Sequence, residues 1–478
     1  MQKLYWIIGL TLMVSVTGCS MVPKYTRPEL PVPTEWPKGD AYKEIKTDTN
    51  APAVDKITWQ QFFTDAKLQT VIDMALKNNR DLRLAALNVE RAQGMYGIQR
   101  AELFPVINAN AGLTKTHLPA DLSGQGVSLT KKTYNVELGM ASWQIDFFGY
   151  IRSLKDAALQ EFFASQMARR SSQITLISQV ANAYLTLAAD NESLQIARST
   201  LDSQQAAYDL IKKRYDIGLS QEIDLLQVQT RVDSARVDVS LYTRLAAQDK
   251  NALDFLVGST VPDDFLPATL DAVAQPQEIS AGISSDVLLR RPDVLQAENM
   301  MLAANANIGA ARAALFPRIA LTSSIGTSST QLSGLFSNGS TTWTFAPQIT
   351  MPIFDPRAWS ALTVTKTDRK IALTKYERTI QQAFKEVADA LAVQGTIESQ
   401  LAAQRSLTKA QDDTYRLSNT RYMKGIDSYL SVIDAQRSLY AAQQGLVSYR
   451  LAKITNQARL YAVLGGGDDS IYANNPKN

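Results

Sequence analysis

The chain contains one histidine, His117, and one cysteine, Cys19, among its 478 residues. These two residue types supply most protein zinc ligands and many nucleophile–base pairs, and each such site needs several of them together. A histidine/cysteine zinc site, a cysteine–histidine nucleophile pair and an intrachain disulfide are therefore excluded. His117 opens a polar stretch, residues 117–132, where we expect it to be solvated in a loop.

Other catalytic chemistry has equally little support in the sequence. No segment follows the phosphate-binding pattern GxxxxGKS/T, and the carboxylates are scattered over helix faces without forming a convincing pair. The 49 basic and 46 acidic residues leave a net charge of +3 and no long basic run, so we expect no nucleic acid partner. We predict that the protein is not an enzyme and binds no metal or dissociable cofactor.

Cys19 stands directly after a short apolar segment at the N-terminus. Leu4–Thr17 is too short to span a bilayer as a helix, for which about 20 residues are needed. Val16-Thr17-Gly18-Cys19 resembles the lipobox of bacterial lipoproteins, so we expect residues 1–18 to be a signal peptide and Cys19 to carry a covalent lipid. In the lipoprotein sorting pattern, Ser20 at the next position favours the outer membrane. An ordinary signal peptide with an incidental cysteine is the alternative.

The remainder of the chain is an internal duplication. Ala101-Glu102-Leu103-Phe104-Pro105 recurs as Ala313-Ala314-Leu315-Phe316-Pro317, 212 residues later. Arg214-Tyr215-Asp216-Ile217-Gly218 recurs as Arg421-Tyr422-Met423-Lys424-Gly425, 207 residues later. The predicted domains are a leader (19–64), a first repeat (65–260), a linker (261–284), a second repeat (285–467) and a C-terminal tail (468–478).

Each repeat is predicted to form a helix, two strands and a long helical hairpin. The first helices should run from about 66 to 102 and from 285 to 315, each ending before a proline. Strands are predicted at about 105–116, 133–147, 317–329 and 341–354, and hairpins at 151–257 and 358–464. The second arm of each hairpin carries a heptad, which indicates packing against neighbouring helices.

The predicted strands have one apolar face and one polar, mostly uncharged face. This alternation suits a transmembrane barrel, although a soluble sandwich strand with one wet face has the same pattern. Four strands cannot close a barrel, since about eight are the usual minimum. We therefore expect the chain to oligomerise, and three copies would supply twelve strands. The alternative is a long antiparallel coiled-coil rod, which would not account for the predicted strands.

The chain resembles a known family over essentially its whole mature length. The residues that carry the resemblance are Asn79-Arg80-Asp81-Leu82, Arg291-Pro292-Asp293, Asn307-Ile308-Gly309-Ala310-Ala311-Arg312, Leu315-Phe316-Pro317, Pro352-Ile353-Phe354, Ala388-Asp389-Ala390-Leu391, Tyr429-Leu430, Asp434-Ala435-Gln436-Arg437-Ser438 and Leu464-Gly465-Gly466-Gly467. Together they are similar to the outer-membrane channels of tripartite efflux pumps and type I secretion systems, in particular the lipidated TolC/OprM-like branch that works with resistance-nodulation-division (RND) transporters.

The resemblance implies an α+β membrane protein with internal duplication. Its trimer would form a 12-stranded outer-membrane β-barrel, four strands per chain, continuous with a long periplasmic α-helical barrel. A mixed equatorial domain would include the leader, the linker and the tail. The expected function is a passive exit duct for drugs and other small amphiphiles. Its expected partners are a periplasmic adaptor, an inner-membrane RND transporter and outer-membrane lipid. The alternatives are a duct for type I protein secretion and a lipid-anchored coiled-coil scaffold without a channel.

Two functional sites are predicted at the ends of the helical hairpins. The residues expected to dock the adaptor are Gly218, Leu219, Ser220, Gly425, Ile426 and Asp427, because glycine favours the turn after a helix and the family meets its adaptor there. The spacing of Asp427, Leu430 and Asp434 predicts that they share nearly one helix face. The resemblance implies a periplasmic gate formed by Tyr422, Leu430, Asp434 and Asp190, with Arg421 as a nearby cation. Asp427 stands where the family has a basic gate residue, so a family-style salt bridge there is in doubt.

Overall fold

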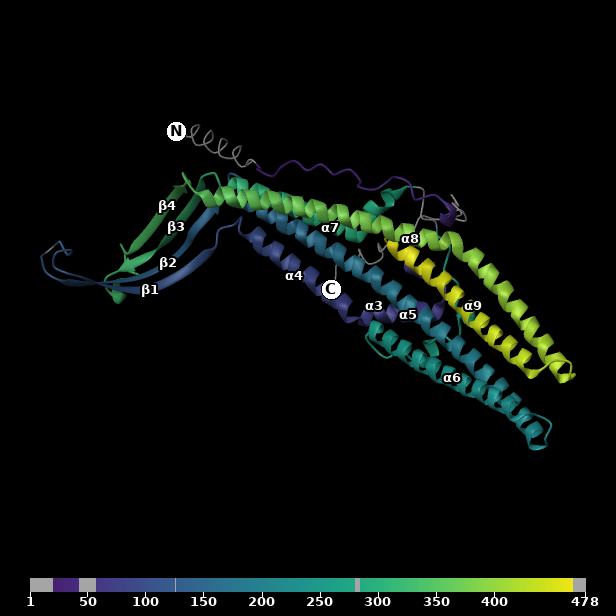
Figure 1. Ribbon diagram of the computed structural model, residues 1–478. Coiled ribbons are helices and arrows are strands. Elements are labelled where there is room, and N and C mark those ends of the chain that lie inside the picture. The colour runs from purple at the N-terminus through teal and green to yellow at the C-terminus, as the bar shows by residue number, and fades with distance from the viewer. Residues whose placement is uncertain (1–19, 43–56, 125, 280–283, 467–478) are drawn as a thin grey trace. The chain divides into compact units, whose positions relative to one another are not determined.

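A computed structural model describes residues 20–42, 57–124, 126–279 and 284–466 (Figure 1). The predicted signal peptide, Cys19 and the tail 468–478 lie outside the described residues. The chain divides into two compact units, which are treated separately: one holds 88–166 and 296–376 with the leader up to Glu29, and the other holds 30–87, 167–295 and 377–478. Among the described residues, no helix is both long and apolar enough to cross a membrane.

The first unit contains a four-stranded antiparallel sheet in the order β1-β2-β3-β4, as predicted for one chain (Figure 1). The strands are β1 (Ile107–Leu118), β2 (Leu129–Ile145), β3 (Arg318–Ser329) and β4 (Thr341–Thr350). The central pairing of β2 with β3 joins the two repeats, and Leu138 stands opposite Ile325. The outer edges of β1 and β4 have no partner strand among the described residues.

The strand register gathers the apolar side chains on one face of the sheet. Ala109 pairs with Leu138, Leu138 with Ile325, and Ile325 with Trp343. Because side chains alternate between the two faces of a strand, the intervening residues form a second face rich in Asn, Gly, Ser and Thr, on which Glu137 also lies. Leu138, Ile325 and Trp343 are 56%, 62% and 75% exposed, so this apolar face is uncovered within the chain.

The sequence predicted that His117 lies in a loop, but the structure places it in a strand. It belongs to β1, where its Nδ1 is 3.2 Å from the hydroxyl oxygen of Thr130 on β2. The hairpin pairing runs to Leu118 opposite Leu129, so the two strands extend into the stretch that composition alone suggested was irregular. The side chain of His117 is exposed, which agrees with the expectation that it is solvated.

Long helices make up most of the remainder. The α-helices are α2 (Trp59–Phe62), α3 (Ala66–Asn78), α4 (Arg80–Ala101), α5 (Tyr150–Asp216), α6 (Glu222–Val257), α7 (Pro292–Ala313), α8 (Pro356–Met423) and α9 (Tyr429–Val463). Short 3-10 turns are η1 (Asp40–Tyr42), η3 (Asp263–Phe265), η4 (Leu270–Ala272), η5 (Ser285–Arg290) and η6 (Leu332–Gly334). At 1.5 Å per residue, the 67 residues of α5 and the 68 of α8 give helices about 100 Å long.

Each predicted first helix is interrupted, at Asn79 and at Arg291, positions that match in the duplication. Asn79 has an extended backbone (ψ 132°); its side-chain oxygen accepts a hydrogen bond from the amide of Leu82 at 2.8 Å, and it thereby begins α4. Arg291 has ψ 136°, because Pro292 disfavours the helical conformation in the residue before it. The continuous helices predicted at 66–102 and 285–315 are therefore wrong: the first is divided at Asn79, and the second consists of a 3-10 helix at 285–290 followed by α7.

A dense core in the second unit holds the beginning of the first repeat against the ends of the hairpins. Phe62 and Tyr461 stack with ring centroids 4.4 Å apart, and both are buried. The side-chain amide of Asn79 donates to the carbonyl of Leu256 at 2.8 Å. Gly258 ends α6 with φ 76°, and a Cβ there would lie 2.6 Å from the carbonyl oxygen of Asn78. This core fixes the base from which both hairpins of the unit extend.

Candidate gate and docking site

The turns that join α5 to α6 and α8 to α9 have the same construction. Gly218 (φ 77°) and Gly425 (φ 69°) occupy the left-handed region, which glycine adopts without strain. The backbone amide of Leu219 donates to the carbonyl oxygen of Arg214 at 2.7 Å, and the backbone amide of Ile426 donates to the carbonyl oxygen of Arg421 at 2.9 Å. Figure 1 shows both turns at the same end of their unit.

The tips of these turns present apolar side chains to the surface. Leu219 is 71% exposed and Ile426 is 58% exposed. A Cβ added at Gly218 or Gly425 would meet no atom within 4 Å. Ser220 donates its hydroxyl to Asp224 at 3.1 Å, at the start of α6. The predicted docking residues therefore form two exposed loops, and docking itself stays a prediction.

The two hairpins pack against each other just behind the turns. Their shared apolar cluster consists of Ile211, Val228, Tyr429, Val432 and Ile433. Farther along, the side-chain amide of Gln204 donates to that of Gln436 at 2.7 Å, and both residues are buried. This packing explains why the second arms carry apolar heptad positions near the turns.

Arg421 and Asp427 form an ion pair within the second turn. Their closest atoms are Nε and Oδ2, 2.6 Å apart, and a second bond joins Nη2 to Oδ1 at 3.1 Å. The side-chain hydrogen bonds from Arg421 lower the pKa of Asp427. Because α9 begins only at Tyr429, Asp427 lies outside the helix. The prediction that it shares a helix face with Leu430 and Asp434 is therefore wrong.

Tyr422 connects the second hairpin to the first. Its hydroxyl oxygen accepts a hydrogen bond from Arg214 Nη1 at 2.8 Å, and the guanidinium carbon lies 5.7 Å from the ring centroid. Its ring also lies 5.0 Å from that of Tyr429. Sequence reasoning placed Arg214 only in a repeated motif and gave it no role. Its match with Arg421 in the duplication was the available signal.

Leu430 and Asp434 lie four residues apart on one face of α9. Leu430 is 53% exposed, and the Asp434 carboxylate lies 3.5 Å from Arg437 on the same helix. Leu430 is thus largely uncovered by the described residues, and the carboxylate of Asp434 is paired along its own helix. Three chains around one axis could therefore bring these side chains together, and their assignment to a gate stays a prediction.

Asp190 does not join the other predicted gate residues. It lies 26 residues before the end of α5, about 39 Å along the helix from the turn. Its carboxyl group shares a hydrogen bond with that of Asp249 on α6. Burial, followed by that neighbouring carboxyl, raises the pKa of Asp249 to about 6, and burial also raises the pKa of Asp190. Within one chain, the acidic residue is part of a separate carboxyl pair.

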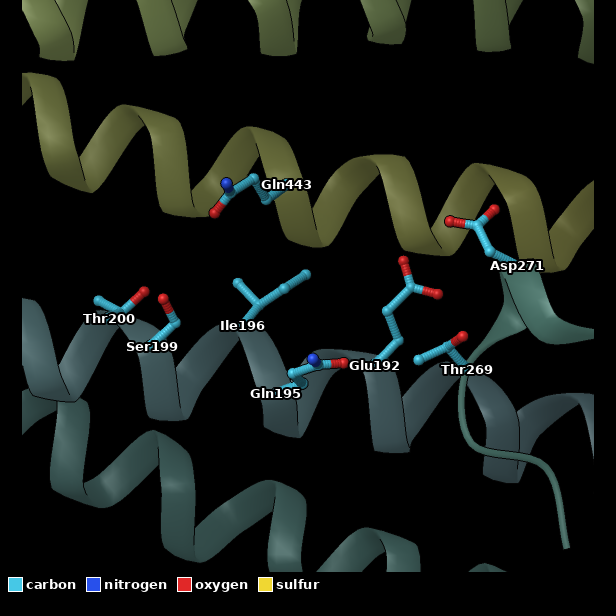
Figure 2. Close-up of a pocket in the computed structure, with 8 residues that line it drawn as sticks. All are labelled: Glu192, Gln195, Ile196, Ser199, Thr200, Thr269, Asp271 and Gln443. Atoms are coloured by element: carbon cyan, nitrogen blue, oxygen red, sulfur yellow. The ribbon is translucent and has the colours of Figure 1, made fainter.

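A polar pocket of about 350 Å³ lies where the linker crosses α5 and α9 (Figure 2). Its lining residues are Glu192, Gln195, Ile196, Ser199, Thr200, Thr269, Asp271 and Gln443. Arg450 donates to Glu192 at 2.6 Å and also forms an ion pair with Asp271. Because Glu192 further accepts the amide of Leu270 at 3.1 Å, the carboxylates here hold the linker in place.

Metal-binding geometry is missing from the described part of the chain. No group of three or more His, Cys, Asp or Glu side chains there is placed to hold a metal ion.

Comparison with known proteins decides what this architecture is. Residues 71–259 and 283–466 match the family model described as outer membrane efflux protein. The chain belongs to this family. The two matched segments coincide with the two repeats recognised from the duplication.

Individual relatives agree with the family model. The chain is 45% identical over 452 residues to the antibiotic efflux pump outer membrane protein ArpC of Pseudomonas putida and, equally, to the toluene efflux pump outer membrane protein TtgC of that species. Each match covers 94% of this chain and 93% of the relative. The open-state crystal structure of the Neisseria gonorrhoeae MtrE outer membrane channel superposes with a TM-score of 0.85 at 36% identity, covering 94% of this chain and 98% of that one. The protein is thus an outer-membrane efflux channel, as its sequence predicted.

Proposed function

We propose that the chain forms a trimeric, passive exit duct for small amphiphiles, supplied by an inner-membrane RND transporter through a periplasmic adaptor. The observation that carries this proposal is the family match over both repeats. The relatives named for toluene and for antibiotics favour small apolar and amphiphilic substrates over exported proteins. An energy source and an enzymatic activity are not required of such a duct, because the transporter supplies the work.

The sheet supports the trimer. An edge strand exposes unpaired N–H and C=O groups, and each unsatisfied group in lipid costs several kcal/mol. Pairing β1 of one chain with β4 of the next in three chains gives a closed barrel of twelve strands. The exposed apolar face then meets lipid, and the face of Asn, Gly, Ser and Thr lines a wet pore.

Cys19 adds a second attachment to the membrane. As the acylated N-terminus, it would tether each chain through its covalent lipid. Labelling with radioactive palmitate should succeed for the natural chain and fail for Cys19→Ala. Continued labelling of Cys19→Ala protein would sink the anchor, whereas loss of labelling with trimers still formed would leave the barrel as the independent attachment.

The two turns are the adaptor-docking surface. The apolar tips Leu219 and Ile426 and the open space around Gly218 and Gly425 support this role, since a partner reaches the backbone there directly. Gly218→Trp and Gly425→Trp should reduce crosslinking to the adaptor while trimers still form. Unchanged crosslinking in both variants would refute docking at the turns.

The gate is formed by Tyr422, Leu430 and Asp434 of three chains. Three converging Asp434 carboxylates repel one another, so closure rests on Leu430 packing and on the hydrogen bond between Arg214 and Tyr422. Single contacts of this kind contribute about 1 kcal/mol each, which a docked adaptor can overcome. Arg421 is already paired with Asp427, so it stabilises its own turn.

The experiment that tests the whole proposal uses cells that lack this chain. They should become hypersensitive to toluene and to antibiotics that the pump exports, and the natural gene should restore tolerance. Restoration by a variant that assembles but does not reach the outer membrane would contradict an exit duct. If the chain were a coiled-coil scaffold without a channel, the natural gene would restore tolerance although the protein formed no conducting pore.

A further inference from the structure

Two lysines stand side by side on one face of the sheet, in the first pair of strands. Lys115 of β1 lies directly opposite Lys132 of β2, and the next pair on the same face is Leu113 with Tyr134. Because side chains alternate along a strand, both lysines continue the apolar face that runs through Leu138. Lys115 and Lys132 are here named the lysine pair.

The lysine pair lies at the end of the sheet away from the helices. β1 begins at Ile107, after α4, and β2 ends at Ile145, before α5, so the helices attach at the opposite end of this strand pair (Figure 1). Lys115 follows Ile107 by eight residues, which is about 26 Å of strand. The outward-facing apolar band of an outer-membrane barrel is about 25 Å tall, so the lysine pair lies near the boundary of that band.

The positive charge of the lysine pair is not balanced within the chain. Both side chains are exposed, and neither ammonium has a hydrogen-bond or ion-pair partner among the described residues. The one carboxylate of β1 and β2, Glu137, lies on the other face of the sheet. Like charges directly opposite each other on two strands destabilise the pairing. An anion held between the two ammonium groups would offset this repulsion.

The second repeat has threonines where the first repeat has the lysine pair. Counted from Ile107 and its match Ile319, Lys115 corresponds to Thr327, which stands opposite Thr341 of β4. Uncharged polar side chains are therefore sufficient to end the apolar face in one repeat. The charge in the other repeat is an additional feature, and it calls for an explanation of its own.

We propose that the lysine pair binds the phosphate groups of the glycolipid that forms the outer leaflet of the outer membrane. The inference rests on the proposed trimeric barrel, which sets the apolar face against lipid and the helices in the periplasm. The end of the sheet away from the helices then lies at the level of the outer headgroups. Lysine binds phosphate as a flexible point charge, and each lysine near an anionic membrane surface strengthens binding about fivefold.

Lipid binding by purified trimers in detergent tests this site. The probes are lipid A that carries both phosphates and the same lipid A after enzymatic removal of its phosphates, and native mass spectrometry measures the bound fraction. The natural trimer should bind the phosphorylated lipid at least ten times more tightly. Lys132→Gln should lower this preference about fivefold, and Lys115→Gln combined with Lys132→Gln should abolish it.

Two controls separate a local site from general attraction between charges. Lys131→Gln changes the net charge as Lys132→Gln does, but Lys131 pairs with Thr116 on the other face, so this variant should bind like the natural protein. In the double glutamine protein, Thr327→Lys with Thr341→Lys rebuilds a lysine pair in the second repeat and should restore the preference. Inorganic phosphate at the same concentration as the lipid should not displace it.

Three outcomes would overturn the lipid site: equal binding of the two lipids by the natural trimer, equal losses in Lys131→Gln and Lys132→Gln, or displacement of the lipid by inorganic phosphate. Conductance of the same preparations separates these outcomes from a failure of the proposed function. Conducting trimers without a preference for phosphate would refute the lipid site alone. A natural chain that forms no conducting trimer would refute the barrel, and with it the placement of the lysine pair at the outer headgroups.

Discussion

The matching helices α4 and α7 have similar sequences and opposite surroundings. None of the residues of α4, all of which the structure describes, is buried, and its Met95 and Ile98 are 53% and 63% exposed. On α7, Ala303 and Ala306 pack against Ala157 of α5, and the leader covers the neighbouring face. The sequence of each helix therefore shows which side chains are apolar, but the elements packed against the helix determine which of those side chains are buried. The uncovered face of α4 is the part of the chain that a second copy is expected to bury.

A charge placed on each of these two helices should have the largest effect of the changes considered. Ile98 of α4 and Ala310 of α7 occupy matching positions, but only Ala310 is buried, at 4% exposure. An unpaired buried carboxylate costs several kcal/mol, so Ala310→Asp should prevent folding. Ile98→Asp should leave the helices folded and abolish the trimer. Circular dichroism and gel mobility of the unheated protein measure the two effects.

Two outcomes would contradict these expectations. A folded, trimeric Ile98→Asp protein would show that α4 faces solvent in the assembly. Folded Ala310→Asp protein would show that the α7 packing does not hold the unit together.

The two turn arginines give a smaller, second comparison. Arg214 bridges the hairpins through Tyr422, whereas the side chain of Arg421 bonds to Asp427 in its own turn. Arg214→Gln should therefore raise the open fraction of reconstituted channels about fivefold, the equivalent of about 1 kcal/mol. Arg421→Gln, the matched control, should change it less. Equal effects in single-channel recordings would remove the special role of the Arg214–Tyr422 bond.

The smallest expected effect concerns pH and the second arms of the two hairpins. Asp249 of α6 matches Asn456 of α9, whose buried amide donates to the carbonyl of Ala390 at 3.0 Å. Since the folded protein raises the pKa of Asp249 from its ordinary value of 3.8 to about 6, the folded state binds the proton more tightly, and stability falls as the pH rises from about 4 to about 6. Asp249→Asn should remove this fall, which solvent screening limits to a few tenths of a kcal/mol.

Thermal unfolding of the trimer between about pH 4 and pH 7 measures this difference. The natural protein should unfold at a lower temperature at the higher pH, and the Asp249→Asn protein should show a flatter profile. The same pH dependence in both proteins would place its origin outside the Asp190–Asp249 pair.

Local patterns predicted much of the fold, and tertiary partners account for what they missed. Alternation along the strands anticipated the apolar face that the register of Leu138, Ile325 and Trp343 produces. The helix break at Asn79 was missed because its cause is a side-chain cap and a distant carbonyl, Leu256. Helical periodicity cannot detect either partner.

The candidate site was predicted less completely for the same reason. Gly218 and Gly425 follow from turn chemistry and occupy turns as expected. Asp427 was placed on α9 by spacing, but its ion pair with Arg421 lies in the turn before that helix. Asp190 was assigned by resemblance, and only the packing of α5 against α6 reveals its pairing with Asp249. The contact of Val22 with Gly309 had no local signal, since Gly309 lies in an ordinary helical pattern.

Single-channel conductance in planar bilayers measures whether the trimer is a gated exit duct. The natural trimer should insert and rest at low conductance. Replacing Tyr422, Leu430 and Asp434 together by small neutral residues should raise the conductance and should admit vancomycin into cells. Trimers of the triple variant with the natural protein's conductance would contradict the gate, and no conductance from either protein would contradict the duct itself.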